Sequence, residues 1–368
     1  MPSPNSAQTW IETRGWLAAF GSSGLLIACF ACGAGSRAQP VEATCPISWD
    51  ESNLVARGGW GRMIQLTNGD WLCVTTRFAR TNSALQLQIS TNAARIWSRL
   101  GEVADGRRFL DNGELIQLPD ASVLLTGRSL IEGESYRLPI YRSTNAGGTW
   151  TFLSNLDANE GVPGTMKGRG LWEPHFYFLP DGRLAVAYAN EKHAVEKPAF
   201  SQVCSVKISP DFGRSWGEEI TLAAEPGGGQ LRPGMPVVAR MADGRFLAVY
   251  EIVGVGDAEV FSKISDDGEH WPEGLGTRVP GHNAGPWVTS LADGRLLLTS
   301  CANVLSCSDD FGRSWHPVSP PAWAVGPGKN FTWPAIYQTA ADEVAVMVSW
   351  SGVKLRFGEL AHPARTSP

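Results

Sequence analysis

Apolar and small residues occur in short runs along most of this chain, and turn-forming residues interrupt the runs at regular intervals. Runs such as residues 183–188 and 245–250 have the length and composition of β-strands. Turns rich in Asp, Asn and Gly precede these runs and are typical of β-hairpins. They recur roughly every 50 to 60 residues, which is a period typical of repeat architectures. The six turns cover residues 66–69, 118–121, 179–182, 241–244, 291–294 and 339–342.

A second motif, S-x-D-x-G-x-x-W, alternates with these turns. We expect its Asp (or Asn) to hydrogen-bond within its own turn, its Gly to permit a positive φ, and its Trp to pack between neighbouring sheets. The motif is therefore predicted to be structural rather than catalytic. In the fourth copy we align Asp266 with the Asp position and Ile264 with the Ser position. The five copies cover residues 90–97, 143–150, 209–216, 264–271 and 308–315.

The alternation of the two motifs predicts an all-β fold, a six-bladed β-propeller of four-stranded antiparallel blades. Residues before Trp60 are predicted to supply the strand that completes the last blade. The sequence shows no linker inside the repeats, so residues 39–368 are expected to form a single propeller domain.

The first 38 residues have the pattern of a targeting segment. Arg14 precedes an apolar run over residues 16–34, and residues 36–38 offer a small-x-small cleavage site. The segment 1–38 is therefore interpreted as a signal peptide, with an uncleaved anchor as one alternative. Residues 26–29 also resemble a bacterial lipoprotein box. No later stretch approaches the roughly 18 apolar residues of a membrane span, so the mature chain is expected to be secreted.

Composition narrows the classes of function. Charged residues make up 18% of the chain and the formal net charge is −5, so the electrostatic footprint of a nucleic-acid or anionic-membrane protein is missing. The 15 tryptophans agree with a repeat in which Trp has a structural place. No Cys or His spacing resembles a zinc site, and we expect no metal or cofactor.

Five cysteines would remain after cleavage of the signal peptide. An odd number cannot all pair, and Cys301 and Cys307 flank a predicted hairpin that a disulfide could bridge. The others are interpreted as buried thiols, which are common in strands. The five are Cys45, Cys73, Cys204, Cys301 and Cys307.

Counting from the last residue of each turn aligns the repeats and predicts one mouth of the propeller. The eighth residue before this point is Gly or Pro in every repeat, namely Gly61, Gly113, Pro174, Pro236, Pro286 and Pro334. The positions on either side of it carry Trp60, Asn112, Glu173, Met235, Gly285 and Trp333, and Arg62, Glu114, His175, Val237, Trp287 and Ala335. The returning strands bring Arg128, Asn190 and Glu251 to the same mouth. Acids, amides, arginines and aromatic rings together are typical of a sugar site.

Glu173 and Glu251 lie on adjacent repeats and are predicted to converge. Retaining glycosidases need two carboxyls about 5 Å apart, and inverting enzymes leave roughly 6.5–9.5 Å for a water molecule. The alternatives are structural: Glu173 bridging to Arg62 or Arg169, and Glu251 pairing with Arg232 or capping a loop.

The remaining candidates are assigned to substrate binding. Glu114 either contacts substrate or supports residues that do, and His175 either contacts substrate or is a satisfied strand histidine. The set comprises Arg62, Asn112, Glu114, Arg128, His175, Asn190, Arg232, Trp287 and Trp333.

The segments around Glu173 (Gly-Leu-Trp-Glu-Pro-His), Arg232 (Arg-Pro-Gly-Met-Pro) and Glu251 (Val-Tyr-Glu) resemble the exo-arabinanases of glycoside hydrolase family 93. The S-x-D-x-G-x-x-W motif is similar to the Asp box of sialidase-like propellers in general. The resemblance implies a retaining enzyme that releases arabinobiose from the non-reducing end of α-1,5-linked arabinan. It further implies that Glu173 is the acid/base, that Glu251 is the nucleophile, and that Tyr337 helps to orient Glu251.

Two other functions remain open from the sequence. An exo-α-sialidase would need three arginines on the substrate carboxylate, which Arg62, Arg128 and Arg232 could supply. A carbohydrate-binding propeller without catalysis would need no reactive carboxylates. The expected partner is plant cell-wall arabinan or another oligosaccharide, with no nucleic acid and no membrane after cleavage, and the chain is expected to be a monomer.

Overall fold

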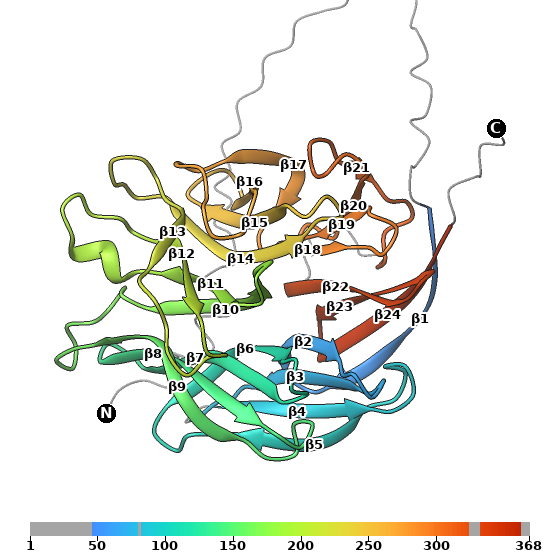
Figure 1. The fold of residues 1–368 in the computed structure, drawn as a ribbon, viewed down its shortest axis with the longest axis horizontal. Coiled ribbons are helices and arrows are strands. Elements are labelled where there is room, and N and C mark those ends of the chain that lie inside the picture. Colours follow the sequence, from blue (N-terminus) through green and yellow to red (C-terminus); the bar gives the residue numbers. More distant parts are fainter. Residues whose placement is uncertain (1–45, 80–81, 324–331, 362–368) are drawn as a thin grey trace, which may run out of the picture. The chain divides into compact units, whose positions relative to one another are not determined.

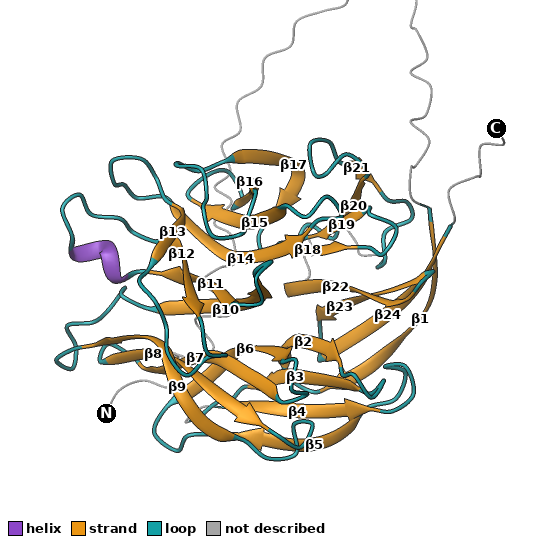
Figure 2. Cartoon of the chain, in the orientation of Figure 1, coloured by secondary structure: helices purple, strands orange, loops and turns teal. Residues whose placement is uncertain are grey.

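The computed structural model describes residues 46–79, 82–323 and 332–361, which belong to one compact unit, Ala43–Pro368. The predicted signal peptide (1–38) and Cys45 lie outside the described residues, as does Asn330 of the sequon 330–332. The described part consists of β-strands and the turns and loops that join them, with one short 3₁₀-helix, η1 (Lys192–Val195), between two strands (Figure 2). No helix of these described segments has the length and apolarity to cross a membrane.

The described residues form six four-stranded antiparallel sheets, which confirms the predicted propeller. We number them as blades one to six in chain order from β2. They comprise β2 (Gly59–Gln65), β3 (Trp71–Arg77), β4 (Ala84–Ser90) and β5 (Ser98–Val103); β6 (Phe109–Gln117), β7 (Val123–Ile131), β8 (Ser135–Ser143) and β9 (Thr151–Glu160); β10 (Leu171–Phe178), β11 (Leu184–Asn190), β12 (Val203–Ser209) and β13 (Ile220–Ala223); β14 (Arg232–Arg240), β15 (Phe246–Val253), β16 (Glu259–Ser265) and β17 (Thr277–Asn283); β18 (Trp287–Ser290), β19 (Leu296–Thr299), β20 (Leu305–Ser308) and β21 (His316–Pro317); and β22 (Thr332–Ala340), β23 (Glu343–Ser349), β24 (Val353–Leu360) and β1 (Ile47–Ala56).

The ring closes through the first described strand. β1 pairs antiparallel with β24 and so forms the outer edge of blade six, as predicted. The innermost strands β2, β6, β10, β14, β18 and β22 contact one another in this order, and β22 returns to β2. In Figure 1 red β22 accordingly lies beside blue β2. Closure through a strand from the other end of the chain leaves the blades no open seam.

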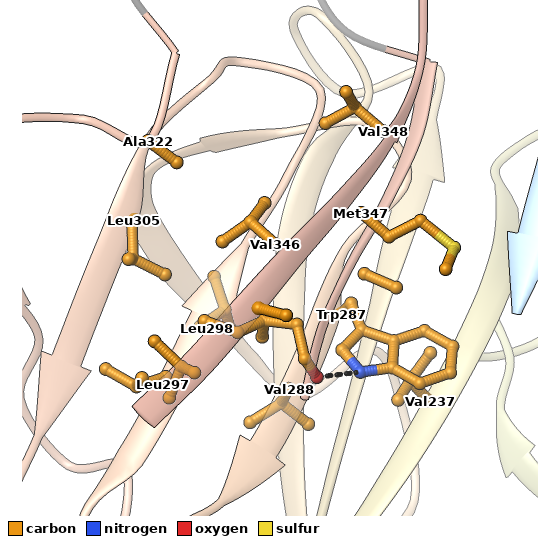
Figure 3. Close-up of a cluster of buried hydrophobic side chains, with 14 of the residues drawn as sticks. Val237, Trp287, Val288, Leu297, Leu298, Leu305, Ala322, Val346, Met347 and Val348 are labelled. Carbon is orange, nitrogen blue, oxygen red and sulfur yellow. Dashed lines mark hydrogen bonds between the residues drawn. The ribbon is translucent and has the colours of Figure 1, made fainter. Parts of the chain in front are cut away.

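Apolar side chains from facing sheets form the core between the blades. Figure 3 shows the cluster between blades five and six, where Leu297, Leu298 and Val346 pack together beside Trp287. The indole N–H of Trp287 donates to the carbonyl of Ile336 at 2.9 Å, so the ring is fixed by packing and by a hydrogen bond. The core therefore positions one of the predicted channel residues.

A break in the pairing recurs at the same place in five innermost strands. The register between the first and second strand shifts across residues 60–61, 112–113, 173–174, 235–236 and 333–334, as in β-bulges. These are the positions that the sequence aligned next to the Gly or Pro. The first residue of each pair has a left-handed backbone, and Gly285 has φ of 50° at the matching place in blade five. The bulges put Glu173, with φ of 56°, at the mouth of the channel.

The S-x-D-x-G-x-x-W turns lie at the other end of the blades, because they connect the third strand of a blade to the fourth. Their predicted local hydrogen bonds are present: Asp211 Oδ1 accepts from Ser209 Oγ and from the N–H of Ser215. The predicted alignment of the fourth copy is wrong. Ser265 and Asp267, not Ile264 and Asp266, form the bonded pair, because this turn is one residue shorter between its acid and its tryptophan.

The disulfide that the sequence allowed between Cys301 and Cys307 is not formed. Both side chains are buried thiols, as are Cys73 and Cys204. Cys307 lies within β20 and pairs across the sheet with Leu297, so its side chain belongs to the core between the blades. Packing in this core explains why the Cys307 side chain is buried.

Candidate active site

The mouth of the channel contains a small recess that is open to solvent. Residues from the first five blades line it, and most were predicted from the aligned repeats. They are Trp60, Arg62, Glu114, Glu173, Pro174, His175, Met235, Pro236, Val237 and Trp287. The recess combines one arginine, two carboxyl groups, an imidazole and two indole rings, as the sequence analysis expected for a sugar site.

Glu173 is buried (8% exposed) although it stands at the end of a strand. Its Oε2 accepts a hydrogen bond of 2.9 Å from the backbone N–H of Met235, the bulge residue of the next blade. Gly234 lies against the same carboxylate, since a Cβ built on it would stand 3.5 Å from Glu173 Oε2 and 2.6 Å from Gln202 Nε2. A side chain at position 234 would therefore disturb the carboxylate and its surroundings.

Glu251 is held in the same manner one blade further on. It is 2% exposed, and its Oε2 accepts a hydrogen bond of 2.7 Å from the backbone N–H of Gly285. A hydrogen bond from a backbone N–H group fixes the orientation of a carboxylate. Each of the two predicted catalytic carboxylates is thus tied to the left-handed residue of the following blade.

Two observations place these carboxylates near each other. Glu251 is the cross-strand partner of Gly234, the glycine that lies against the Glu173 carboxylate. In addition, burial raises the pKa of the Cys204 thiol, and the negative charges of both Glu173 and Glu251 raise it further. The predicted convergence of Glu173 and Glu251 therefore agrees with the register of β14 and β15.

Arg62 and Glu114 form a buried pair in the recess. The guanidinium of Arg62 lies between the rings of Trp60 and Trp287, at 4.5 and 4.6 Å from their centroids. Its Nε is 3.8 Å from Glu114 Oε2. Burial raises the pKa of the Glu114 carboxyl to about 8, although the positive charge of Arg62 acts in the opposite direction. Glu114 is therefore largely protonated at neutral pH and can donate as well as accept a hydrogen bond.

His175 and Tyr337 meet at the ring of Trp287, whose centroid is 5.3 Å from the imidazole and 5.5 Å from the phenol. His175 Nε2 is 3.1 Å from the carbonyl oxygen of Val238. The Tyr337 hydroxyl accepts a hydrogen bond of 3.2 Å from the N–H of Met63. Burial raises the pKa of this hydroxyl, with Arg62 and Glu114 as its charged neighbours. Tyr337 thus borders the Arg62–Glu114 pair.

Three predicted substrate-binding residues lie beside the recess rather than in its wall. Arg128 forms an ion pair with Asp111 and lies 4.0 Å from the ring centroid of Trp172. Asn112 occupies the bulge of blade two and is 8% exposed. Trp333 packs against Trp60, with ring centroids 5.6 Å apart. These residues surround the mouth.

Arg232 binds a carboxylate that the sequence analysis overlooked. Its Nη2 donates to Glu191 Oε1 at 2.5 Å and to Gln202 Oε1 at 2.8 Å. The other oxygen of Glu191 accepts the N–H of Gly170 at 2.6 Å, just before β10. Glu191 therefore fastens the start of β10, which carries Glu173, to the start of β14, which carries Met235.

Asn190 belongs to a separate polar cluster on blade three. Its Nδ2 donates to Ser205 Oγ at 3.2 Å and to Glu219 Oε1 at 3.0 Å, and it is fully buried. Glu219 also binds His193 of η1 at 2.7 Å. The cluster anchors the connection between β11 and β12, which includes Glu191.

The backbone N–H groups that orient the carboxylates were not predicted from the sequence. The aligned repeats contained Met235 and Gly285, but their contribution is a backbone N–H, which no side-chain pattern reveals. The presence of Gly and Asn among the six aligned residues was a weak signal of a left-handed backbone. Glu191 follows β11 without any motif. Among the described residues, no group of three or more His, Cys, Asp and Glu side chains is arranged to hold a metal.

No protein-family model matches this chain, and no curated protein has a matching sequence. Solved structures, in contrast, have similar folds. A Penicillium chrysogenum α-L-arabinanase complexed with arabinobiose matches with a TM-score of 0.70 and 18% identity, over 86% of this chain and 99% of that chain. A family 93 α-L-arabinofuranosidase of Fusarium graminearum with arabinobiose matches with a TM-score of 0.70 and 15% identity, over 85% and 98%.

A sialidase fold matches as well. The NanB sialidase from Streptococcus pneumoniae has a TM-score of 0.60 and 10% identity, over 87% of this chain and 71% of that chain. At these identities the likeness concerns the fold alone, and it agrees with the predicted six-bladed β-propeller.

Proposed function

We propose that this chain is a retaining glycoside hydrolase that acts on α-1,5-linked L-arabinan and releases arabinobiose from the non-reducing end. The observation that carries the proposal is the pair Glu173 and Glu251. Both are buried at one mouth of the propeller, and each accepts a backbone N–H from the next blade. Gly234, which lies against the Glu173 carboxylate, is the cross-strand partner of Glu251. The fold shared with an arabinanase and an arabinofuranosidase, each bound to arabinobiose, supports the choice of substrate.

In the proposed mechanism Glu173 protonates the glycosidic oxygen while Glu251 attacks the anomeric carbon. The glycosidic bond breaks and a covalent glycosyl-enzyme forms. Glu173, now ionised, removes a proton from water, which attacks the same carbon and releases Glu251. The two N–H donors, Met235 and Gly285, keep the carboxylates in place throughout. Glu173 and Glu251 would thus keep their positions during both formation and hydrolysis of the glycosyl-enzyme.

The charges around the mouth favour a neutral sugar over a sialic acid. A sialidase would need arginines that are available to the substrate carboxylate. Two of the three predicted arginines already bind a carboxylate of the protein: Arg128 binds Asp111, and Arg232 binds Glu191. An anionic substrate would have to compete with these carboxylates, so we place the sialidase function second.

The proposal extends to the cellular context. The N-terminal pattern at residues 1–38 supports secretion, and arabinan is a cell-wall polymer outside the cytoplasm. We propose that the mature enzyme is secreted and acts as a monomer.

The test is an assay of the wild-type protein on linear α-1,5-arabinan and on a sialyl conjugate, with analysis of the products. We expect arabinobiose as the sole early product, and free sialic acid would overturn the proposal. Glu251→Gln should lower kcat roughly 10⁴-fold or more, and Glu173→Gln about 10²–10⁴-fold. A binding propeller without catalysis would hydrolyse neither substrate and would bind arabinobiose equally well with either substitution.

A further inference from the structure

Two buried polar atoms of the recess have no hydrogen-bond partner among the described residues. They are Nε of Arg62 and Nδ1 of His175. Nearly all buried polar atoms in proteins are satisfied, so an unsatisfied donor and an unsatisfied acceptor in one recess indicate a common ligand group.

Nδ1 of His175 is a hydrogen-bond acceptor. Nε2 lies 3.1 Å from the carbonyl oxygen of Val238, which can only accept, so Nε2 carries the proton. Burial lowers the pKa of His175 to about 4, and the positive charge of Arg62 acts in the same direction. The imidazole is therefore neutral at ordinary pH, and Nδ1 presents a lone pair.

Nε of Arg62 is a hydrogen-bond donor, and the orientation of its guanidinium is fixed. Trp60 and Trp287 hold the guanidinium between their rings, and Nη1 donates to the carbonyls of Gly61 at 2.7 Å and Trp333 at 3.1 Å. The Arg62 side chain is 3% exposed. Nε is 3.8 Å from Glu114 Oε2, which is beyond hydrogen-bond distance. The N–H of Nε therefore remains available to a group in the recess.

The two residues lie around the same recess and beside the same ring. Both residues line the recess and both contact Trp287, Arg62 at 4.6 Å and His175 at 5.3 Å from the ring centroid. A group that satisfies both must accept from Arg62 and donate to His175. A carboxylate has no hydrogen to donate and an ammonium has no lone pair, whereas a hydroxyl group has both.

We propose that Arg62 and His175 together bind one hydroxyl group of the non-reducing terminal sugar: Arg62 Nε–H donates to the hydroxyl oxygen, and the hydroxyl hydrogen is donated to His175 Nδ1. This inference rests on the proposed function and deepens it, because it names the group by which the recess selects a neutral sugar. Glu173 lines the same recess, so holding the terminal sugar there positions the glycosidic bond of the next residue, which is the bond cleaved on release of arabinobiose, relative to the acid.

The experiment measures binding of arabinobiose to the Glu251→Gln variant, so that no hydrolysis intervenes. Three analogues are compared, each lacking one hydroxyl of the terminal residue, at C2, C3 or C5. We expect one analogue to bind roughly 10- to 100-fold more weakly than arabinobiose, as for a buried hydrogen-bonding site left unpaired. Adding His175→Phe should remove this difference for that analogue alone.

A second variant, Arg62→Lys, removes Nε–H and keeps a cation, and it should reduce the same difference. His282→Phe is the matched control. His282 is another buried histidine, but both of its nitrogens bind serines, Ser300 and Ser306, outside the recess. This substitution should leave the discrimination between analogues unchanged.

The outcomes separate the two proposals. The inference is wrong if arabinobiose binds but the difference in affinity between arabinobiose and each analogue stays the same with His175→Phe and with Arg62→Lys. The hydroxyl would then be bound elsewhere. If arabinobiose does not bind and arabinan is not hydrolysed, the proposed function fails as well.

Discussion

The two ends of the blades satisfy their polar groups in different ways. At the end that carries the S-x-D-x-G-x-x-W turns, the Ser and Asp of the motif hydrogen-bond inside their own turn. Asp211 accepts from Ser209 and Ser215, and the N–H of Gly213 donates to Ser209 Oγ. The motif of each turn is therefore satisfied locally, although other contacts, such as the Arg95–Glu343 ion pair, join the blades at this end.

At the mouth, hydrogen bonds join one blade to the next. Those from Met235 to Glu173 and from Gly285 to Glu251 span 62 and 34 residues. Their geometry exists only after neighbouring blades have packed, and their acceptors are the two carboxylates to which we assign the chemistry. We therefore expect the turn end to contribute to stability and the mouth to contribute to catalysis.

Among the tests that compare the two ends of the blades, the largest effect on kcat is expected from substitution of Glu191. Glu191→Gln removes the charge that binds Arg232 and weakens the tie between the starts of β10 and β14. Because small misplacements of catalytic groups are costly, kcat should fall roughly 10²-fold. The measurement is the pH profile of kcat and KM, in which kcat should fall more than KM changes.

The matched control for this variant breaks an Arg–Glu pair at the other end. Arg95 binds Glu343 and joins a turn of blade one to blade six. Glu343→Gln should leave kcat and its pH profile unchanged. Equal effects of the two substitutions would show that Glu191 has only a general structural role.

A smaller effect is expected from breaking a turn. Asp211→Ala removes the hydrogen bonds from Ser209 and Ser215 and should cost about 1–2 kcal/mol of unfolding free energy. Activity per folded molecule should stay constant, as chemical denaturation combined with active-site titration can establish. Asp211→Asn is the control, because Asn145 accepts the equivalent bonds in blade two. Loss of kcat with Asp211→Ala would contradict the separation of the two ends.

The smallest effect concerns the charges that anchor the connection between β11 and β12. The hydrogen bond to Glu219 raises the pKa of His193 to about 9. Burial alone would raise the pKa of Glu219, but bonds from His193 and Ser205 outweigh it and lower the pKa to about 2. The pair therefore contributes fully between the unperturbed pKa values of about 4.5 and 6.5.

The contribution should disappear as pH rises through about 9, where His193 loses its proton, and as pH falls through about 2, where Glu219 gains one. We expect His193→Gln to be less stable than wild type by on the order of 1 kcal/mol near pH 5.5, with convergence towards pH 9. Urea unfolding across this pH range measures the difference. A difference independent of pH would mean that the ion pair contributes nothing.

The number of blades, their strand order and the position of Glu173 at the mouth followed from the periodic turns. The structure also agrees with the predicted closure by the first strand. The disulfide between Cys301 and Cys307 and the alignment at Asp266 failed, because core packing and a shortened turn leave no periodic trace in these few residues.

The repeat could be predicted from the amino-acid sequence, since turns and strands are local and follow from Gly, Asp and the alternation of apolar residues. So could the carboxylates that stand at the mouth, because one register aligns all six blades. Only the tertiary structure decided which groups they meet. The N–H donors of Met235 and Gly285, the pairing of Arg232 with Glu191, and the unsatisfied atoms of Arg62 and His175 all depend on contacts between blades. Such contacts depend on backbone geometry and on side-chain directions after closure, which residue identity alone leaves undetermined.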